Sequence, residues 1–169
     1  NKLGIKIISI YVDILDTDES LRKEMVLQLT DKLHDVFSRM PNEIGFEIYG
    51  EDGEQKKNRE GSGLLVYLSI GFGGRSEITK AVKSILSDVI SGKLKPDDIN
   101  ENNIESSLLV KHEPDIVIRA GGKHLSDFLI WQSVYSELYF TDVNWHDVRK
   151  IEMLRIVRDF QKRQRRFGK

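Results

Sequence analysis

The chain has 169 residues, 39% of them hydrophobic, so it can bury one ordinary core, and we expect a single domain over residues 1–169. The formal net charge of −1 gives no general attraction to nucleic acid, and the lack of cysteine excludes disulfides and thiolate metal sites. No apolar run approaches the roughly 20 residues that cross a bilayer, and with no cysteine in the chain we expect an intracellular, cytoplasmic protein.

The first half of the chain predicts two strands separated by a helix. Residues 3–11 are a β-branched run, typical of a strand, and Ser20 is expected to cap the helix that follows. Pro41 ends this helix, residues 44–49 predict the second strand, and the polar stretch 50–63 predicts a loop. Apolar residues recur along the helix every three to four positions and indicate a core-facing stripe: Leu21, Met25, Leu29, Leu33 and Val36 or Phe37.

The second half continues the alternation of strands and helices. Residues 64–70 form an apolar run typical of a strand covered on both faces, and it leads into a glycine turn at 71–74. Ser76 is expected to cap a helix that Gly92 ends. Its predicted buried face consists of Ile78, Val82, Ile85, Leu86 and Val89.

Three further elements complete the prediction, namely a short helix at 104–110, a strand at 115–119 and a last helix that begins near Asp147 or Arg149. Strands that alternate with helices favour a parallel sheet. We therefore expect the α/β class, with a mostly parallel central sheet and helices on both faces.

The stretch 115–142 concentrates residues suited to binding a phosphate. Gly121 and Gly122 allow a sharp turn with accessible amides at the end of a predicted strand, and Ser126 can cap an apolar helix that follows. Amide groups and the dipole at a helix start attract anions, and Arg119 adds a planar cationic fork. The pattern predicts a diphosphate site at this turn.

The order of these residues closely resembles the cis-prenyltransferases, the family of undecaprenyl and dehydrodolichyl diphosphate synthases. The similar positions are Arg-Ala-Gly-Gly at 119–122, Leu-Ser-Asp-Phe-Leu-Ile-Trp-Gln at 125–132 and Tyr-Ser-Glu-Leu-Tyr-Phe-Thr-Asp at 135–142. Two weaker matches follow the same order, Gly-Phe-Gly-Gly-Arg-Ser-Glu-Ile at 71–78 and Arg-Gln-Arg-Arg-Phe-Gly at 163–168. The resemblance implies an enzyme that condenses isopentenyl diphosphate with an allylic diphosphate into a polyprenyl diphosphate, using Mg²⁺.

The resemblance assigns roles to particular residues. It implies that Arg119 and Ser126 bind the diphosphate of isopentenyl diphosphate, the alternatives being a structural ion pair and a plain helix cap. It implies that Glu137 takes part in Mg²⁺ binding, where the alternative is a surface charge at a helix end. Gly73, Gly74 and Arg75 are expected at another turn near the site, the alternative being a tight turn with a surface arginine.

The basic C-terminus carries a further implied role. By the resemblance, Arg166 and Gly168 reach across a dimer interface to the partner's substrate phosphate, which requires a homodimer or a heterodimer with a related subunit. The alternative is a solvated helix face with a frayed end. A long-chain lipid product implies the membrane surface as a second location.

The chain also departs from the family pattern. The segment between the glycine pair and Ser126 is one residue short and lacks an arginine, which Lys123 can replace in charge but not in geometry. The family's catalytic aspartate is expected upstream of Asn1, and a further family helix has no counterpart in 50–63. A non-catalytic accessory subunit is therefore the main alternative. A phosphate-metabolite-binding α/β domain is a third, although it does not explain the match over 128–142.

Overall fold

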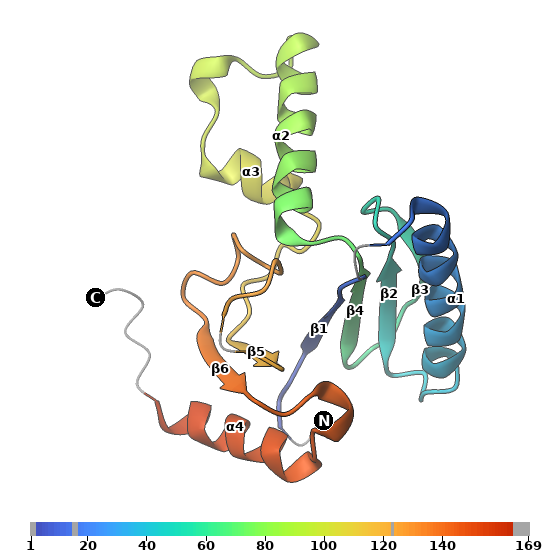
Figure 1. The fold of residues 1–169 in the computed structure, drawn as a ribbon. Helices are drawn as coiled ribbons and strands as arrows, with labels where there is room; N and C mark the ends of the chain where they lie inside the picture. Colours follow the sequence, from blue (N-terminus) through green and yellow to red (C-terminus); the bar gives the residue numbers. More distant parts are fainter. Residues whose placement is uncertain (1–2, 15–16, 123, 164–169) are drawn as a thin grey trace. The chain divides into compact units, whose positions relative to one another are not determined.

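The computed structural model describes residues 3–14, 17–122 and 124–163, and the chain divides into two compact units, residues 1–80 and 81–169. Figure 1 labels the helices and strands. The first unit contains β1 (Ile7–Val12), α1 (Glu19–Ser38), β2 (Gly45–Tyr49), β3 (Gln55–Arg59), β4 (Leu65–Ile70) and the start of α2 (Gly74–Ile90). Its strands form one sheet in the order β1-β4-β2-β3.

Three strands of this sheet are parallel, and the fourth is an antiparallel edge. β4 pairs in parallel with both β1 and β2, whereas β3 pairs antiparallel with β2. The prediction of a loop over 50–63 is therefore wrong in its middle, where β3 completes a hairpin. The strand has the sequence Gln-Lys-Lys-Asn-Arg and mostly exposed side chains, so only its backbone pairing defines it.

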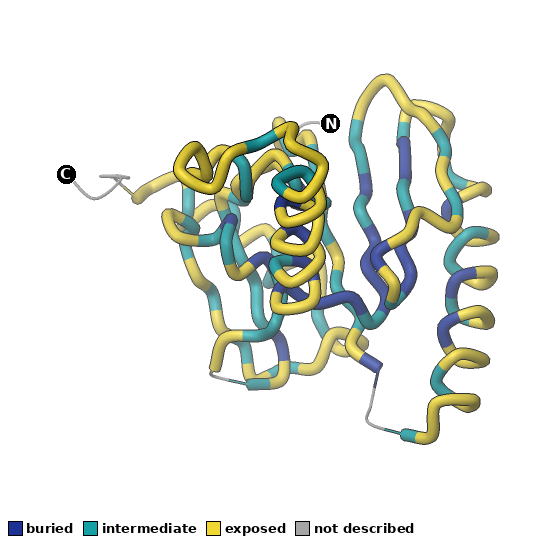
Figure 2. Tube along the Cα trace, turned by 90° about the horizontal axis from the view of Figure 1, so that it is seen from above, coloured by how far each residue is buried: buried dark blue, intermediate teal, exposed yellow. Residues whose placement is uncertain are grey.

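The core of the first unit lies between α1 and one face of the sheet. Phe46 and Ile48 of β2 stand beside Val66 and Leu68 of β4, and all four side chains are buried. Figure 2 shows buried residues along these strands and on the side of α1 that faces them. Other members of this cluster are Ile14, Val26, Phe37 and Ile70, with Leu29 and Leu33 packed against it.

The first turn of α1 is capped by a residue other than the one predicted. The carboxylate of Asp18 accepts hydrogen bonds from the backbone N–H groups of Ser20, at 2.8 Å, and Leu21, at 3.2 Å. Asp18 rather than Ser20 is thus the N-cap. The predicted apolar stripe is confirmed at Phe37, whereas Met25 remains 40% exposed.

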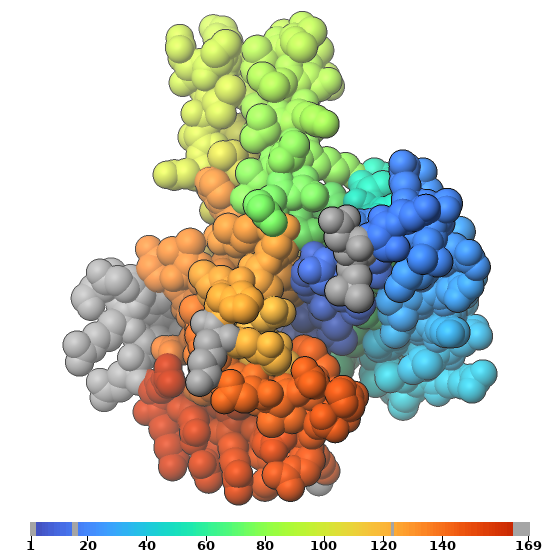
Figure 3. All heavy atoms as spheres, viewed as in Figure 1, coloured from blue at the N-terminus to red at the C-terminus, as the bar shows by residue number. Residues whose placement is uncertain are grey.

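The second unit contains the rest of α2 and a two-stranded parallel sheet. Its elements are η1 (Pro96–Asp98), α3 (Glu101–Ser107), β5 (Ile116–Ala120), β6 (Glu137–Thr141), η2 (Trp145–Asp147) and α4 (Lys150–Lys162). Figure 3 shows the atoms of α4, in red, against those of residues 142–149 in orange. On α2, Ile85 is buried as predicted, but Val82 is 43% and Leu86 52% exposed.

These elements confirm the predicted α/β class with mostly parallel strands, because only β3 runs antiparallel among the strand pairs of the described residues. A single domain over 1–169 stays a prediction. In the described part of the chain no helix is both long and apolar enough to span a membrane.

Candidate functional site

The connection from β5 to β6 differs from the helix that the sequence predicted. Residues 124–136 form bends and turns, so Ser126 caps no helix. Leu129 has a φ of 50°, a left-handed conformation that interrupts a right-handed helix. The backbone closes separate turns instead, from the N–H of Ser133 to the carbonyl of Leu129 and from the N–H of Ser136 to the carbonyl of Ser133, each at 3.0 Å. The expected helix dipole is therefore not available to bind an anion here.

Side-chain hydrogen bonds hold this connection in place instead. The Gln132 amide nitrogen donates to the carbonyl oxygen of Val110 at 2.8 Å, and the Ser136 hydroxyl donates to that of Pro114 at 2.6 Å. Both acceptors precede β5 in the chain. The connection is thus tied back to the approach to β5, and Leu129 is buried within it.

The glycine turn after β5 is confirmed, but one of its amides is already used. Gly121 has a φ of 72°, which favours glycine, and its N–H donates a hydrogen bond of 3.0 Å to the carbonyl oxygen of Thr141. This bond extends the β5–β6 pairing. The prediction that both glycines offer accessible amides is wrong for Gly121.

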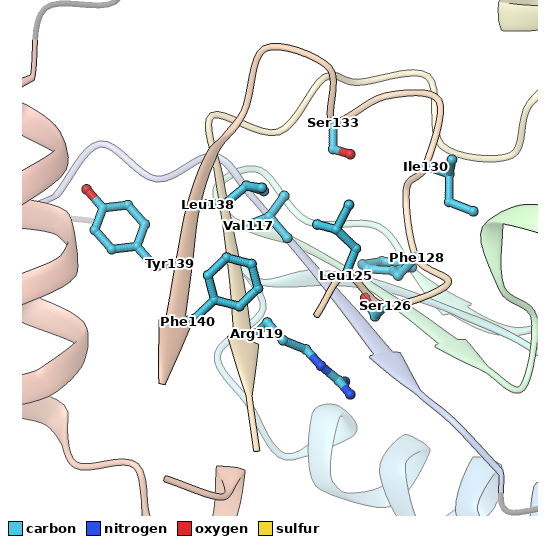
Figure 4. Close-up of a pocket in the computed structure, with 10 residues that line it drawn as sticks. All are labelled: Val117, Arg119, Leu125, Ser126, Phe128, Ile130, Ser133, Leu138, Tyr139 and Phe140. Carbon is cyan, nitrogen blue, oxygen red and sulfur yellow. The ribbon is translucent and has the colours of Figure 1, made fainter. Parts of the chain in front are cut away.

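A pocket of about 220 Å³ opens beside the two strands. Figure 4 shows the arrangement of its lining residues. They are mostly apolar, with one guanidinium and three hydroxyl-bearing side chains among them: Val117, Arg119, Leu125, Ser126, Phe128, Ile130, Ser133, Leu138, Tyr139 and Phe140. The two residues predicted to bind a diphosphate, Arg119 and Ser126, therefore lie at one pocket.

Arg119 stands near the carboxyl end of β5 and carries an unsatisfied donor. Its Nε atom is buried and has no hydrogen-bond partner in the structure. A buried donor without a partner costs free energy in a folded protein, so such groups point to a bound molecule or water that satisfies them. An oxygen-rich anion fits a guanidinium in this position.

The register of β5 and β6 decides which side chains share a face with Arg119. Arg119 stands opposite Phe140, and Val117 opposite Leu138, so these four project to the pocket side. Glu137 and Tyr139 alternate with Leu138 and Phe140 along β6 and project to the other side. Figure 4 shows the Tyr139 ring turned away from the pocket, although the residue borders it.

Glu137 is the first residue of β6, so it is not the helix-end charge considered above. Its carboxylate forms an ion pair with Arg163, whose guanidinium carbon lies 4.9 Å from the centroid of the Tyr139 ring. The hydrogen bond from Arg163 to Glu137 raises the pKa of the arginine. The structure brings Arg119 and Ser126 together but places Glu137 on the opposite face.

Few of these side chains are arranged to bind a metal ion. The described residues contain no cluster of three or more histidine, cysteine, aspartate or glutamate side chains able to hold one. Mg²⁺ can bind through one or two carboxylates with substrate phosphates. Glu137, however, is paired with a cation and separated by the strands from Arg119, so the described residues do not fit a Mg²⁺ ion at the pocket.

The other predicted site residues lie elsewhere. Arg75 is an exposed residue of the first turn of α2, in the first unit. Lys123, Arg166 and Gly168 lie outside the described residues. The sequence analysis did not single out Tyr139 and Arg163 as a pair, because they are 24 positions apart and no local spacing pattern links them.

Comparison with known proteins shows the family to which the chain belongs. A family model described as "Putative undecaprenyl diphosphate synthase" matches residues 18–168. The chain belongs to this family. The recognition of a cis-prenyltransferase from the sequence is thereby confirmed, and the family's members are prenyltransferases of isoprenoid synthesis.

Curated relatives match most of this chain. A tritrans,polycis-undecaprenyl-diphosphate synthase (geranylgeranyl-diphosphate specific) of Picrophilus torridus is 38% identical, over 94% of this chain and 60% of its own length. The chain thus spans less than two thirds of that relative. An isoprenyl transferase of Streptococcus pyogenes is 34% identical, over 100% of this chain and 77% of its own length.

A solved structure has a fold similar to that of this chain. Lavandulyl diphosphate synthase from Lavandula x intermedia, crystallised with dimethylallyl diphosphate, aligns with a TM-score of 0.82 and 26% identity. The alignment covers 99% of this chain and 81% of that protein.

Proposed function

We propose that the protein condenses isopentenyl diphosphate with an allylic diphosphate and forms the new double bond in the cis configuration. The proposal rests on one observation. Arg119 and Ser126 line the same pocket, and the buried Nε of Arg119 has no hydrogen-bond partner. Family membership supports the reaction class. One named relative is an undecaprenyl-diphosphate synthase and a solved relative was crystallised with dimethylallyl diphosphate, and both molecules are isoprenoid diphosphates.

The pocket suits the headgroup of such a substrate. The Arg119 guanidinium can form two parallel hydrogen bonds to diphosphate oxygens, and the Ser126 hydroxyl can donate one more. The walls beside these two groups are mostly apolar and include Leu125, Phe128 and Ile130. At about 220 Å³ the pocket is smaller than the roughly 300–1,000 Å³ of typical ligand sites. It therefore fits a headgroup better than a whole prenyl chain.

Mg²⁺ is the cofactor that the resemblance implies, and bound to substrate it would neutralise charge on the departing diphosphate. Glu137 is the one predicted ligand among the described residues, and that role stays a prediction. We assign it no step, because Glu137 lies across the β5–β6 pair from Arg119. The contribution that we assign to the described residues is binding and orientation of a diphosphate by Arg119 and Ser126.

The proposal is tested by turnover of the purified full-length protein. Radiolabelled isopentenyl diphosphate, Mg²⁺ and farnesyl or geranylgeranyl diphosphate should give a chain-extended lipid. Arg119→Ala should lower kcat/KM about 10- to 100-fold, since a hydrogen bond to a charged group contributes about 1.5–3 kcal/mol. Arg119→Lys should restore only part of it, because an ammonium lacks the planar fork. Arg39→Ala, which removes an exposed cation of the first unit, is the matched control.

Absence of product with every allylic primer, or full activity of Arg119→Ala, would contradict this assignment. A second candidate is the accessory subunit of a heteromeric enzyme. The placement of Glu137 away from Arg119 favours it, because a catalytic chain is expected to bring both groups to one substrate. As an accessory subunit, the chain would be inactive alone but would raise the activity of a related catalytic subunit through Arg166 and Gly168.

Oligomeric state separates the two candidates further. The homodimer expected for the enzyme should give twice the mass of the chain in light scattering after gel filtration. The accessory subunit should instead form a one-to-one complex with the catalytic subunit.

A further inference from the structure

The connection from β5 to β6 brings hydroxyl groups to two levels of the pocket. The two strands are parallel, so this connection must return from the carboxyl end of β5 to the amino end of β6. Ser126 comes early in it and Ser133 late, and both side chains line the pocket. Figure 4 shows Ser126 on the side of Arg119 and Ser133 at the opposite side of the pocket.

The register of the strands places an apolar band between these two ends. Arg119 stands two residues beyond Val117 on β5, and Val117 pairs with Leu138 of β6. Two residues along a strand span roughly 6.6 Å, so this apolar pair separates the guanidinium from Ser133. Leu125 lies between the same two ends in Figure 4. The pocket thus offers, in order, a cation, an apolar wall and a hydroxyl group.

The backbone of Ser133 is fixed, whereas its hydroxyl group remains available to a ligand. Its N–H donates to the carbonyl oxygen of Leu129, and its own carbonyl oxygen accepts from the N–H of Ser136, each at 3.0 Å. Among the described residues the Ser133 hydroxyl has no hydrogen-bond partner, unlike that of Ser136, which donates to the carbonyl oxygen of Pro114. A half-buried hydroxyl group at a mostly apolar wall is satisfied by water or by a polar group of the ligand.

We propose that the pocket also binds a short-chain isoprenoid diphosphate that carries a hydroxyl group at the end remote from the diphosphate, and that Ser133 recognises this oxygen. The inference rests on the proposed function, in which Arg119 and Ser126 hold the diphosphate. The branched hydrocarbon would lie against Val117 and Leu138, and the terminal oxygen would meet Ser133.

The same hydroxyl group makes Ser133 a specificity-determining residue. A ligand that ends in a methyl group, such as isopentenyl diphosphate, covers the Ser133 hydroxyl without giving it a partner, which costs free energy. Sites that hydrogen-bond a hydroxyl group discriminate against analogues that lack it. Isopentenyl diphosphate therefore binds, but less tightly than its hydroxylated counterpart.

Calorimetric titration of the full-length protein in the presence of Mg²⁺ tests this with two ligands that differ by one oxygen atom. They are isopentyl diphosphate and its analogue with a hydroxyl group on one terminal methyl carbon. Neither contains the double bond that condensation requires, so the measurement reports binding alone. The wild type should bind the hydroxylated ligand about two- to ten-fold more tightly, the range for one hydrogen bond between neutral groups. Ser133→Ala should remove this preference.

Two further variants separate recognition from a structural effect. Ser133→Thr keeps a hydroxyl group and should keep the preference, even where the added methyl group weakens binding of both ligands. Ser106→Ala, which removes an exposed hydroxyl group of α3, is the matched control and should change neither affinity. Thermal denaturation should give the same Tm for Ser133→Ala and the wild type, because the hydroxyl group has no protein partner to lose.

The outcomes distinguish this inference from the proposed function. Equal affinity of the wild type for the two ligands, or a preference that persists in Ser133→Ala, would overturn the role of Ser133 and leave the diphosphate site standing. Arg119→Ala and Ser126→Ala should weaken both ligands by the same factor, because they act on the diphosphate. If those two variants bound both ligands as the wild type does, the proposed function would fail and this inference with it.

Discussion

The backbone N–H of Gly121 donates a hydrogen bond of 3.0 Å to the carbonyl oxygen of Thr141. The bond continues the parallel pairing of β5 and β6, whose last paired residues are Ala120 and Thr141. It places the end of β5, with Arg119, firmly beside β6. The same bond removes from phosphate binding an amide that the glycine-rich sequence had suggested. The pocket therefore depends on side chains more than on the backbone of this turn.

We expect Gly121→Ala to destabilise the protein more than Gly92→Ala does. Both glycines have a positive φ, 72° and 74°, so each alanine costs about 1–2 kcal/mol of backbone strain. A Cβ on Gly121 would also lie 3.0 Å from Asn144 Oδ1, whereas one on Gly92 would meet nothing within 4 Å. Urea denaturation measures both. Equal losses would contradict a tight contact at Gly121, and only Gly121→Ala should weaken diphosphate binding.

A close backbone approach in the first unit should make Gly61→Ala severely destabilising. A Cβ on Gly61 would lie 2.1 Å from the backbone nitrogen of Gly45, an overlap that no side-chain movement relieves. We expect the free energy of unfolding to fall by about 4 kcal/mol or more, as in other substitutions with severe steric overlap. Gly63→Ala is the matched control, because its Cβ would lie 3.0 Å from Glu43 O. Comparable stability of the two variants in thermal denaturation would contradict the clash.

Replacing Arg119 by methionine should stabilise the protein in the absence of ligand. The buried Nε has no hydrogen-bond partner, and methionine removes this unsatisfied donor while it keeps the volume of the stem. We expect a gain of about 1 kcal/mol and loss of the thermal shift that isopentenyl diphosphate gives to the wild type. Differential scanning calorimetry measures both effects. A marked fall in Tm without ligand would instead support the structural ion pair considered from the sequence.

Stability at acid pH should depend on Asp18. Hydrogen bonds from the Ser20 hydroxyl, and then from the Leu21 and Ser20 amides, lower the pKa of Asp18 below its ordinary 3.8. A lowered carboxyl pKa contributes stability that is fully present above pH 3.8 and is lost as the pH falls through the folded value. Asn at an N-cap accepts the same bonds but does not titrate.

Asp18→Asn should therefore keep nearly the wild-type Tm at pH 7 and lose less of it between pH 4 and pH 2. Scanning calorimetry across this range measures the slope. Glu152→Gln on α4, which removes another carboxylate of lowered pKa, is a matched comparison at the N-terminus of a different helix. If Tm fell with pH between pH 4 and pH 2 as steeply in Asp18→Asn as in the wild type, the titration of Asp18 would not contribute to the loss of stability in acid.

The sequence by itself determined the elements whose side chains carry a strong pattern. The strands predicted at 44–49 and 64–70 became β2 and β4, and the largely apolar run at 64–70 suits a strand buried in a sheet. Helical spacing was sufficient to find α1, α2 and α4. The family motif likewise predicted that Arg119 and Ser126 lie close together, and they line one pocket.

Only the tertiary structure decided the features that depend on pairing between distant backbones. β3 is polar and exposed, so its hydrogen bonds to β2 define it rather than any hydrophobic pattern. The left-handed conformation of Leu129 replaced an expected helix with turns. The register of β5 against β6 put Glu137 on the face opposite Arg119 and beside Arg163. Successive strand residues point to opposite faces, so no linear motif specifies which of them share a site until the strands are paired.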